Sequence, residues 1–125
     1  MPGPNRLSRG IEAEAAACRY LEERGLKCID RNVRCRFGEI DLVMQAADLL
    51  VFVEVRFRRA SNPVNAIDSI DAHKQRKLAL TASWYLSRAP RLRNSSVRFD
   101  VIAIDGRSRG ESALQWITDA FRPGA

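Results

Sequence analysis

Two carboxylates set in apolar surroundings are the residues of this sequence best suited to chemistry. Asp41 lies in the run Ile40–Met44, and Glu54 lies in the run Leu49–Val55. The second run is rich in β-branched and aromatic residues, which favour β-strands, and a short polar break separates the two runs. The segment is therefore predicted to be a β-hairpin with one carboxylate on each strand.

The turn of this hairpin decides whether the two carboxylates meet. A two-residue turn at Ala47-Asp48 pairs the strands so that Asp41 lies opposite Glu54 on one face. Arg56 shares that face, because side chains alternate along a strand. Opposed like charges destabilise a sheet, and buried carboxylates need a partner, so a positive group is expected between them. A divalent cation and Arg56 are the two candidates.

The first predicted helix precedes the hairpin and carries a carboxylate on its apolar stripe. Asn5 or Ser8 can cap this helix, which runs to about Arg24 and ends at Gly25. The carboxylate is Glu14. It either stays hydrated near the helix start, where the helix dipole favours negative charge, or points toward the acidic site of the hairpin.

A second long helix is predicted after the hairpin, over about Ala72–Ser87. Asp71 can cap this helix, and Pro90 follows its end. Lys74 lies on the same stripe as the apolar residue Leu78. A lysine in a first turn is commonly solvated; the alternative is a catalytic or phosphate-holding role for this amine.

Further strands complete a predicted α/β fold. The order helix–strand–strand–strand–helix–strand, with a further short strand as an option, predicts a mixed β-sheet flanked by helices, in which the strands after the second helix are added in parallel. The length of 125 residues fits one domain over 1–125, with loose ends at 1–5 and 122–125. The remaining assignments are strands at Leu26–Asn32, Val97–Ile104 (with Asp100 as a structural residue) and Ala113–Ile117, loops at 59–65 and 91–96, and a helical turn at Thr118–Phe121.

The charge balance favours a polyanionic partner. Lysine and arginine number 21 against 15 acidic residues, a net charge of +6. Arginine dominates, and its planar fork suits phosphate, so nucleic acid is the expected partner, with DNA ahead of RNA. A bias toward arginine in the genome is the alternative explanation for the many arginines, but it explains the excess of positive over negative charge less well. The arginines near the hairpin expected to bind nucleic acid are Arg34, Arg36, Arg58 and Arg59.

Other features exclude several classes of protein. The longest apolar run is too short to span a membrane, and no apolar stretch follows the basic residues near the start, so neither a membrane span nor a secretory signal is expected. The three cysteines contain no CxxC pair, which fits reduced thiols in the cytoplasm. A single histidine argues against a structural zinc site.

These residues resemble the PD-(D/E)XK nuclease superfamily, in which a helix precedes a hairpin that bears Asp and Glu-x-Lys. The chain is more closely similar to the YraN-type family of bacterial proteins, which resemble Holliday-junction resolvases. The resemblance covers nearly the whole chain, and its most specific blocks are GEIDL at 38–42 and FVEV at 52–55. It implies a restriction-endonuclease-like three-layer core. It also implies that Asp41 and Glu54 bind Mg²⁺ or Mn²⁺, that Glu14 is an accessory acid and that residue 56 is the catalytic cation.

Position 56 departs from the superfamily pattern, because it is arginine where lysine is usual. Arginine stays protonated and cannot act as a base, although it can hold a phosphate. Lys74 is a candidate to supply the missing amine. The implied function is a metal-dependent endonuclease that hydrolyses phosphodiester bonds in DNA, with branched DNA as one candidate substrate. The alternative is a catalytically inactive nucleic-acid-binding protein in which Arg56 neutralises the carboxylates. A resolvase-like role would require a homodimer.

Overall fold

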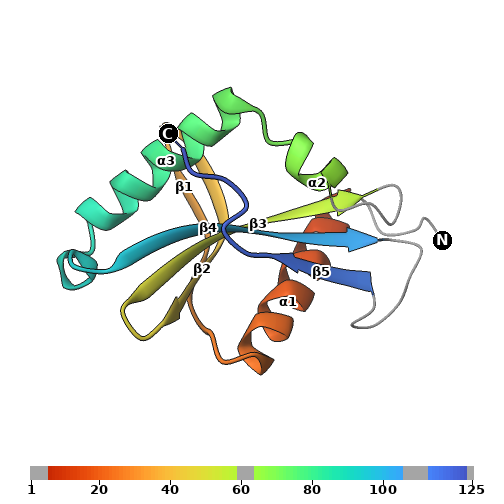
Figure 1. Ribbon diagram of the computed structural model, residues 1–125, viewed down its shortest axis with the longest axis horizontal. Helices are drawn as coiled ribbons and strands as arrows, with labels where there is room; N and C mark the ends of the chain where they lie inside the picture. The colour runs from red at the N-terminus through yellow and green to blue at the C-terminus, as the bar shows by residue number, and fades with distance from the viewer. Residues whose placement is uncertain (1–5, 59–63, 106–112, 124–125) are drawn as a thin grey trace.

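The computed structural model describes residues 6–58, 64–105 and 113–123 (Figure 1). No described helix is long and apolar enough to cross a membrane. The elements in chain order are α1 (Arg6–Glu23), β1 (Lys27–Cys35), β2 (Gly38–Ala46), β3 (Leu49–Arg58), α2 (Val64–Asp68), α3 (Ala72–Ser87), the 3-10 turn η1 (Pro90–Leu92), β4 (Ser96–Asp105) and β5 (Leu114–Ile117).

The strands form one mixed sheet in the order β1-β2-β3-β4-β5. Neighbouring strands are antiparallel from β1 to β3 and again between β4 and β5. Strand β4 pairs in parallel with β3, from Leu49↔Ser96 to Arg58↔Asp105. The parallel addition expected for the strands after the second long helix is therefore confirmed for β4. It is wrong for β5, which returns antiparallel to β4.

Helices α1 and α3 cover opposite faces of the sheet, which gives three layers (Figure 1). Leu21 of α1 packs with Leu42 and Val53 on one face. Leu78 of α3 packs with Phe52 on the other face, where Phe52 also meets the Tyr85 ring edge-on at 6.0 Å. Alternation along β3 therefore divides its side chains between the two cores, as period-two geometry requires. The predicted α/β class and three-layer core are confirmed.

The cap of α3 forms as the sequence predicts. The Asp71 carboxylate accepts a hydrogen bond from the Lys74 backbone N–H at 2.9 Å. This contact satisfies one of the free N–H groups of the first turn, and it fixes where the helix begins relative to β2 and β3. Gly25 follows the end of α1 with φ at 96°, a conformation that suits glycine, and it confirms the predicted stop.

Three local predictions are wrong. Strand β1 continues beyond Asn32 to Cys35, because its last residues pair with the start of β2. The predicted loop at 59–65 is interrupted by α2, which begins at Val64; positions 59–63 lie outside the described residues. The predicted helical turn at Thr118–Phe121 is instead a turn in which Asp119 has a φ of 51° and the Ala120 N–H donates to the Phe99 carbonyl at 2.8 Å.

Candidate functional site

A pocket of about 370 Å³ lies between the β2–β3 hairpin and the first turns of α3. We call it the acidic pocket because both carboxylates of the hairpin line it. It brings together four residues predicted from the sequence to form a site. The residues that line it are Gly38, Glu39, Asp41, Glu54, Val55, Arg56, Lys74, Lys77 and Leu78.

The hairpin opens at the point where the carboxylates lie. Regular pairing runs from Ala46↔Leu49 to Leu42↔Val53, which confirms the two-residue turn. Asp41 is the next residue of β2, and its Oδ2 accepts a hydrogen bond from the Val55 backbone N–H at 2.8 Å. A side chain thus satisfies a β3 backbone donor just beyond the last regular pair, and this bond fixes the Asp41 carboxylate at the pocket.

Glu54 is the most buried carboxylate of the pocket, with 8% of the residue exposed. Burial raises the pKa of Glu54 most, the nearby Asp41 carboxylate raises it further and Arg56 opposes them, so that the pKa is about 8. The pKa of Asp41 is also raised, chiefly by burial, although the Val55 N–H and Arg56 lower it. Glu54 is therefore mostly protonated at neutral pH unless another positive charge joins the pocket.

Arg56 satisfies Glu54 only in part. Its Nη2 lies 3.3 Å from Glu54 Oε2. Within the described part of the chain, Glu54 Oε1 and Arg56 Nε are buried without a hydrogen-bond partner. Leaving such a group unpaired costs about 1–3 kcal/mol. The pair is therefore an incomplete neutralisation, and the free Glu54 oxygen can accept a further ligand.

The donor set fits a hard divalent cation that keeps other ligands. Asp41 and Glu54 supply two carboxylates, and Mg²⁺ is usually bound by one or two carboxylates together with water and substrate phosphates. Among the described residues, no three His, Cys, Asp or Glu side chains form a group that could hold a metal. Any cation here would therefore take its remaining ligands from water, backbone or substrate, while the unpartnered oxygen of Glu54 offers one protein ligand.

Glu14 lies on α1, in the opposite helix layer, and its pKa responds to the charge of the acidic site. Burial raises the pKa of Glu14 most and the Asp41 carboxylate raises it further, while a hydrogen bond with the Asn32 side chain lowers it. Glu14 is not among the residues that line the pocket. Glu14 therefore lies outside the pocket, and its link to the acidic site is the effect of the Asp41 charge on its pKa.

Two lysines of α3 face the carboxylates. Lys74 is exposed and lines the pocket from the first turn of the helix. Lys77 lines it one turn later, and the sequence analysis missed this residue. The signal was available, because residues three apart share a helix face. Together with Arg56, these lysines put three basic side chains among the residues that line the pocket.

The arginines predicted to bind nucleic acid are only partly described. Arg34 is exposed near the end of β1, and its Nε lies 3.0 Å from Glu39 Oε2, a surface pair of a kind that stabilises little. Arg36 is exposed in the following turn, 4.8 Å from the centroid of the Phe37 ring. Arg58 ends β3, but its side chain lies outside the described part, as does all of Arg59.

Asp100 has the structural role expected from the sequence. It is fully buried in β4 and accepts hydrogen bonds at 2.8 Å from both Nε and Nη2 of Arg98. It also accepts from Trp116 Nε1 at 2.8 Å and from the Asp119 N–H at 2.9 Å. These bonds attach β5 and the following turn to the sheet, and Asp100 does not line the acidic pocket.

The fold and the pocket define a three-layer α/β protein with a charged site at the open end of a β-hairpin. A model of the uncharacterised protein family UPF0102 matches residues 13–104. A UPF0102 protein of Pseudomonas putida is 45% identical over 121 residues, which cover 97% of this chain and 98% of that protein. A UPF0102 protein of Nitrosococcus oceani is 46% identical over 114 residues, 91% of each chain. The chain therefore belongs to the UPF0102 family, which is the YraN-type family that its motifs resemble.

Proposed function

We propose that this protein is a metal-dependent endonuclease that hydrolyses phosphodiester bonds in DNA. The observation that carries the proposal is the buried Glu54 Oε1, which has no partner within the described residues although a guanidinium lies next to it. A site meant only for internal neutralisation would pair both carboxylate oxygens with the arginine fork. An oxygen kept free beside Asp41 suits a ligand that arrives from outside.

The residues of the pocket divide into metal ligands and phosphate-binding groups. Asp41 and Glu54 would hold Mg²⁺ or Mn²⁺, which, when bound, lowers the pKa of a water ligand and stabilises charge on phosphoryl oxygens. Arg56, Lys74 and Lys77 bind the phosphodiester and stabilise the additional charge of the transition state. Arg56 cannot take a proton from the attacking water. We therefore assign the place of the superfamily lysine to the amine of Lys74, which as a cation holds the phosphodiester and orients that water.

The expected substrate is DNA, because the basic residues around the pocket match a phosphate backbone and the family resemblance is to DNA resolvases. Hydrolysis adds water across one ester bond and leaves a phosphate monoester and a hydroxyl group. Symmetric cutting of a branched substrate would bring two copies of the chain together.

Two measurements test this function. Calorimetry should detect Mn²⁺ binding by the wild type and its loss in Asp41→Asn and Glu54→Gln. With Mn²⁺ present, the same variants should lose cleavage of linear, flapped and four-way DNA, whereas Glu39→Gln, which changes an exposed carboxylate of the same pocket, should retain both properties. Cleavage that survives Asp41→Asn would exclude this mechanism.

A nucleic-acid-binding protein without turnover is the second candidate. The contact of 3.3 Å between Arg56 and Glu54 favours it, because an arginine already occupies part of the acidic site. This alternative predicts salt-dependent DNA binding that is indifferent to chelator and to Asp41→Asn. Repeating the Mn²⁺ titration with DNA present separates the two candidates, since a metal that enters only with the substrate phosphate would then bind.

A further inference from the structure

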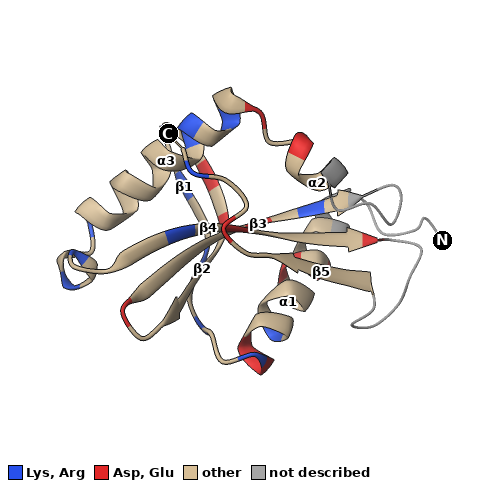
Figure 2. Cartoon of the chain, in the orientation of Figure 1, with Lys and Arg blue, Asp and Glu red and all other residues tan. Residues whose placement is uncertain are grey.

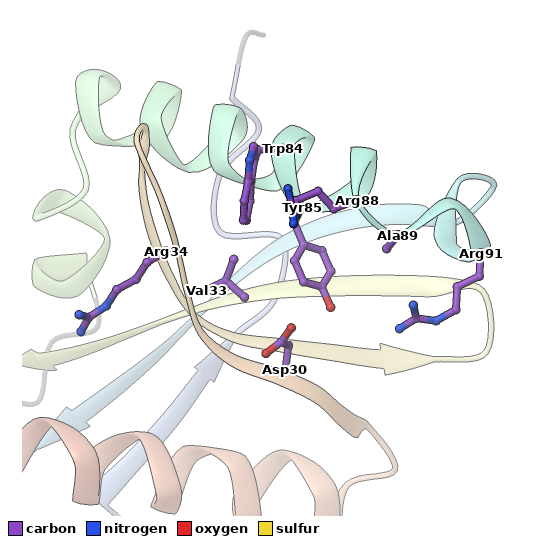
Figure 3. A pocket seen from close by; sticks show the side chains of 8 residues that line it. All are labelled: Asp30, Val33, Arg34, Trp84, Tyr85, Arg88, Ala89 and Arg91. Atoms are coloured by element: carbon purple, nitrogen blue, oxygen red, sulfur yellow. The ribbon is translucent and has the colours of Figure 1, made fainter.

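A second cavity, of about 320 Å³, opens between β1 and the second half of α3. Figure 3 shows Trp84 and Tyr85 extending from α3 toward β1, with Asp30 facing the hydroxyl end of Tyr85. The proposed endonuclease mechanism uses none of its side chains. We call it the arginine–aromatic cleft; it is lined by Asp30, Val33, Arg34, Trp84, Tyr85, Arg88, Ala89 and Arg91.

The cleft has an excess of positive charge. Arg88 and Arg91 are exposed, and neither forms an ion pair with another described residue. Asp30 is the single carboxylate among its lining residues, and it is engaged by Tyr85: burial raises the pKa of Tyr85 most, and the charge of Asp30 and a hydrogen bond between the two side chains raise it further. Two arginines are thus left for an anionic ligand. Figure 2 shows basic residues both near the start of α3 and in the segment after it.

An aromatic face lies beside these cations. Trp84 is half-buried, and the Arg88 guanidinium lies over its ring at 5.1 Å from the centroid. This contact fixes the indole and keeps a cation next to it. A flat group that stacks on the indole and carries a phosphate would satisfy both features. The volume falls at the low end of the range of about 300–1,000 Å³ for small-molecule sites, which suits one nucleotide and is too small for a base pair with its backbone.

The cleft adjoins the acidic pocket. Arg34 lines the cleft and pairs with Glu39, which lines the pocket. Along α3, Lys77 of the pocket and Trp84 of the cleft are seven residues apart, which is roughly 10 Å at about 1.5 Å per residue. That distance corresponds to about three nucleotides stacked at about 3.4 Å each. One strand can therefore reach both places.

We propose that the arginine–aromatic cleft binds one unpaired nucleotide of the strand whose phosphodiester enters the acidic pocket. The base stacks against Trp84, and its phosphates contact Arg88 and Arg91. The proposal rests on the proposed function in taking nucleic acid as the ligand, and it narrows the substrate class. DNA with an unpaired segment, such as a flap, an overhang or a single strand, is preferred over a continuous duplex, because a paired base cannot leave its stack without cost.

The experiment measures binding alone, with chelator present, so that it does not depend on cleavage. Fluorescence anisotropy compares a short labelled oligothymidylate with a blunt duplex of equal length, for the wild type, Trp84→Leu and Arg88→Gln. Arg19→Gln is the matched control, since it removes the same charge from an exposed site on α1, in the opposite layer. Thermal unfolding establishes that each variant is folded, and Arg88 is exposed, so its replacement leaves the core intact.

The single strand should bind the wild type more tightly than the duplex. Trp84→Leu should weaken single-strand binding by about 5- to 150-fold, the effect of losing one base–aromatic stack, and should leave duplex binding nearly unchanged. Arg88→Gln should reduce the magnitude of the slope of the logarithm of the binding constant against the logarithm of the salt concentration by about 1, the effect of losing one phosphate contact. Arg19→Gln should match the wild type. The proposal is overturned if Trp84→Leu binds the single strand like the wild type, if Arg88→Gln changes nothing beyond the Arg19→Gln control, or if the wild type does not bind the single strand. If the protein binds as expected but cleaves no DNA, the proposed endonuclease function is wrong, and the proposed nucleotide-binding role of the cleft still holds.

Discussion

Replacing Glu54 by glutamine tests the electrostatics of the acidic pocket directly. Glutamine keeps the shape of the side chain and removes its ability to ionise. When a chelator keeps metal ions away, the wild type must hold Glu54 in a buried position beside Asp41. Burial and the neighbouring carboxylate both oppose ionisation of Glu54 there. Glu54→Gln should therefore stabilise the fold at neutral pH, although Arg56 then has an uncharged amide oxygen as its partner in place of a carboxylate.

The size of the effect follows from the pKa of Glu54, which is about 8 in the folded protein and ordinarily 4.5. Between these values the folded state binds more protons than the unfolded state. The stability that protonated Glu54 contributes is therefore complete below pH 4.5 and is lost as the pH rises toward about 8. The full difference between the folded and unfolded pKa values corresponds to about 5 kcal/mol of folding stability. As the pH rises, less than about 1 kcal/mol of this stability is lost by about pH 5 and about 3 kcal/mol by about pH 7.

The assay is urea unfolding with chelator, followed by tryptophan fluorescence at about pH 5 and about pH 7. Relative to the wild type, Glu54→Gln should gain about 2–3 kcal/mol in free energy of unfolding at the higher pH and little at the lower pH. Glu12→Gln, which changes an exposed carboxylate of α1 that does not line the pocket, should follow the wild type at both values.

A glutamine variant that is less stable than the wild type at neutral pH would refute this reasoning. Breaking a buried ion pair costs about 3–5 kcal/mol because it leaves the partner charge uncompensated. That outcome would mean that the contact between Arg56 and Glu54 dominates over burial, and it would favour the non-catalytic alternative, in which Arg56 occupies the place of a metal.

Three further predictions concern the metal and the fold. Mn²⁺ should raise the unfolding temperature of the wild type but not of Asp41→Asn, and titrations in buffers of different ionisation enthalpy should show proton release, because binding the ion requires Glu54 to ionise. Asp71→Ala should lower the free energy of urea unfolding by about 1 kcal/mol, since it removes the cap on the Lys74 N–H. Phe52→Ala should lower the free energy of unfolding, also measured in urea, by about 3–5 kcal/mol, because the Phe52 ring is 2% exposed and packs under α3.

Much of the fold could be predicted because its strongest signals are local. The Asp71 cap and the hairpin with its two-residue turn depend on residues adjacent in sequence, and both form as expected. The end of β1 could not be found in this way. Asn32 adopts a left-handed backbone with φ at 50°, which interrupts the alternation, and the strand continues only because Val33 and its successors pair with β2. Pairing with a neighbouring strand can thus extend a β-strand beyond the point where the alternation in its own sequence ends.

The same distinction separates the predictable from the unpredictable parts of the site. The two-residue turn and the register up to Leu42↔Val53 follow from the hairpin sequence. Regular pairing stops there, and Asp41 and Glu54 then meet as residues that line one pocket. The charge of Asp41 raises the pKa of Glu14 because of the way α1 packs across the sheet. No local sequence pattern determines that packing. The unpartnered oxygen of Glu54 depends on the rotamer that Arg56 adopts in a packed environment.

Helix α3 explains why two sites lie side by side on one face of the molecule. Its buried stripe, from Leu78 to Tyr85, is fixed against the sheet by Phe52. Residues that flank such a stripe must lie along the seam between helix and sheet, so Lys77 reaches the acidic pocket near one end and Trp84 reaches the arginine–aromatic cleft near the other. The helical rise sets their separation at roughly 10 Å. The packing that stabilises the core therefore also sets the distance over which a bound strand would have to extend.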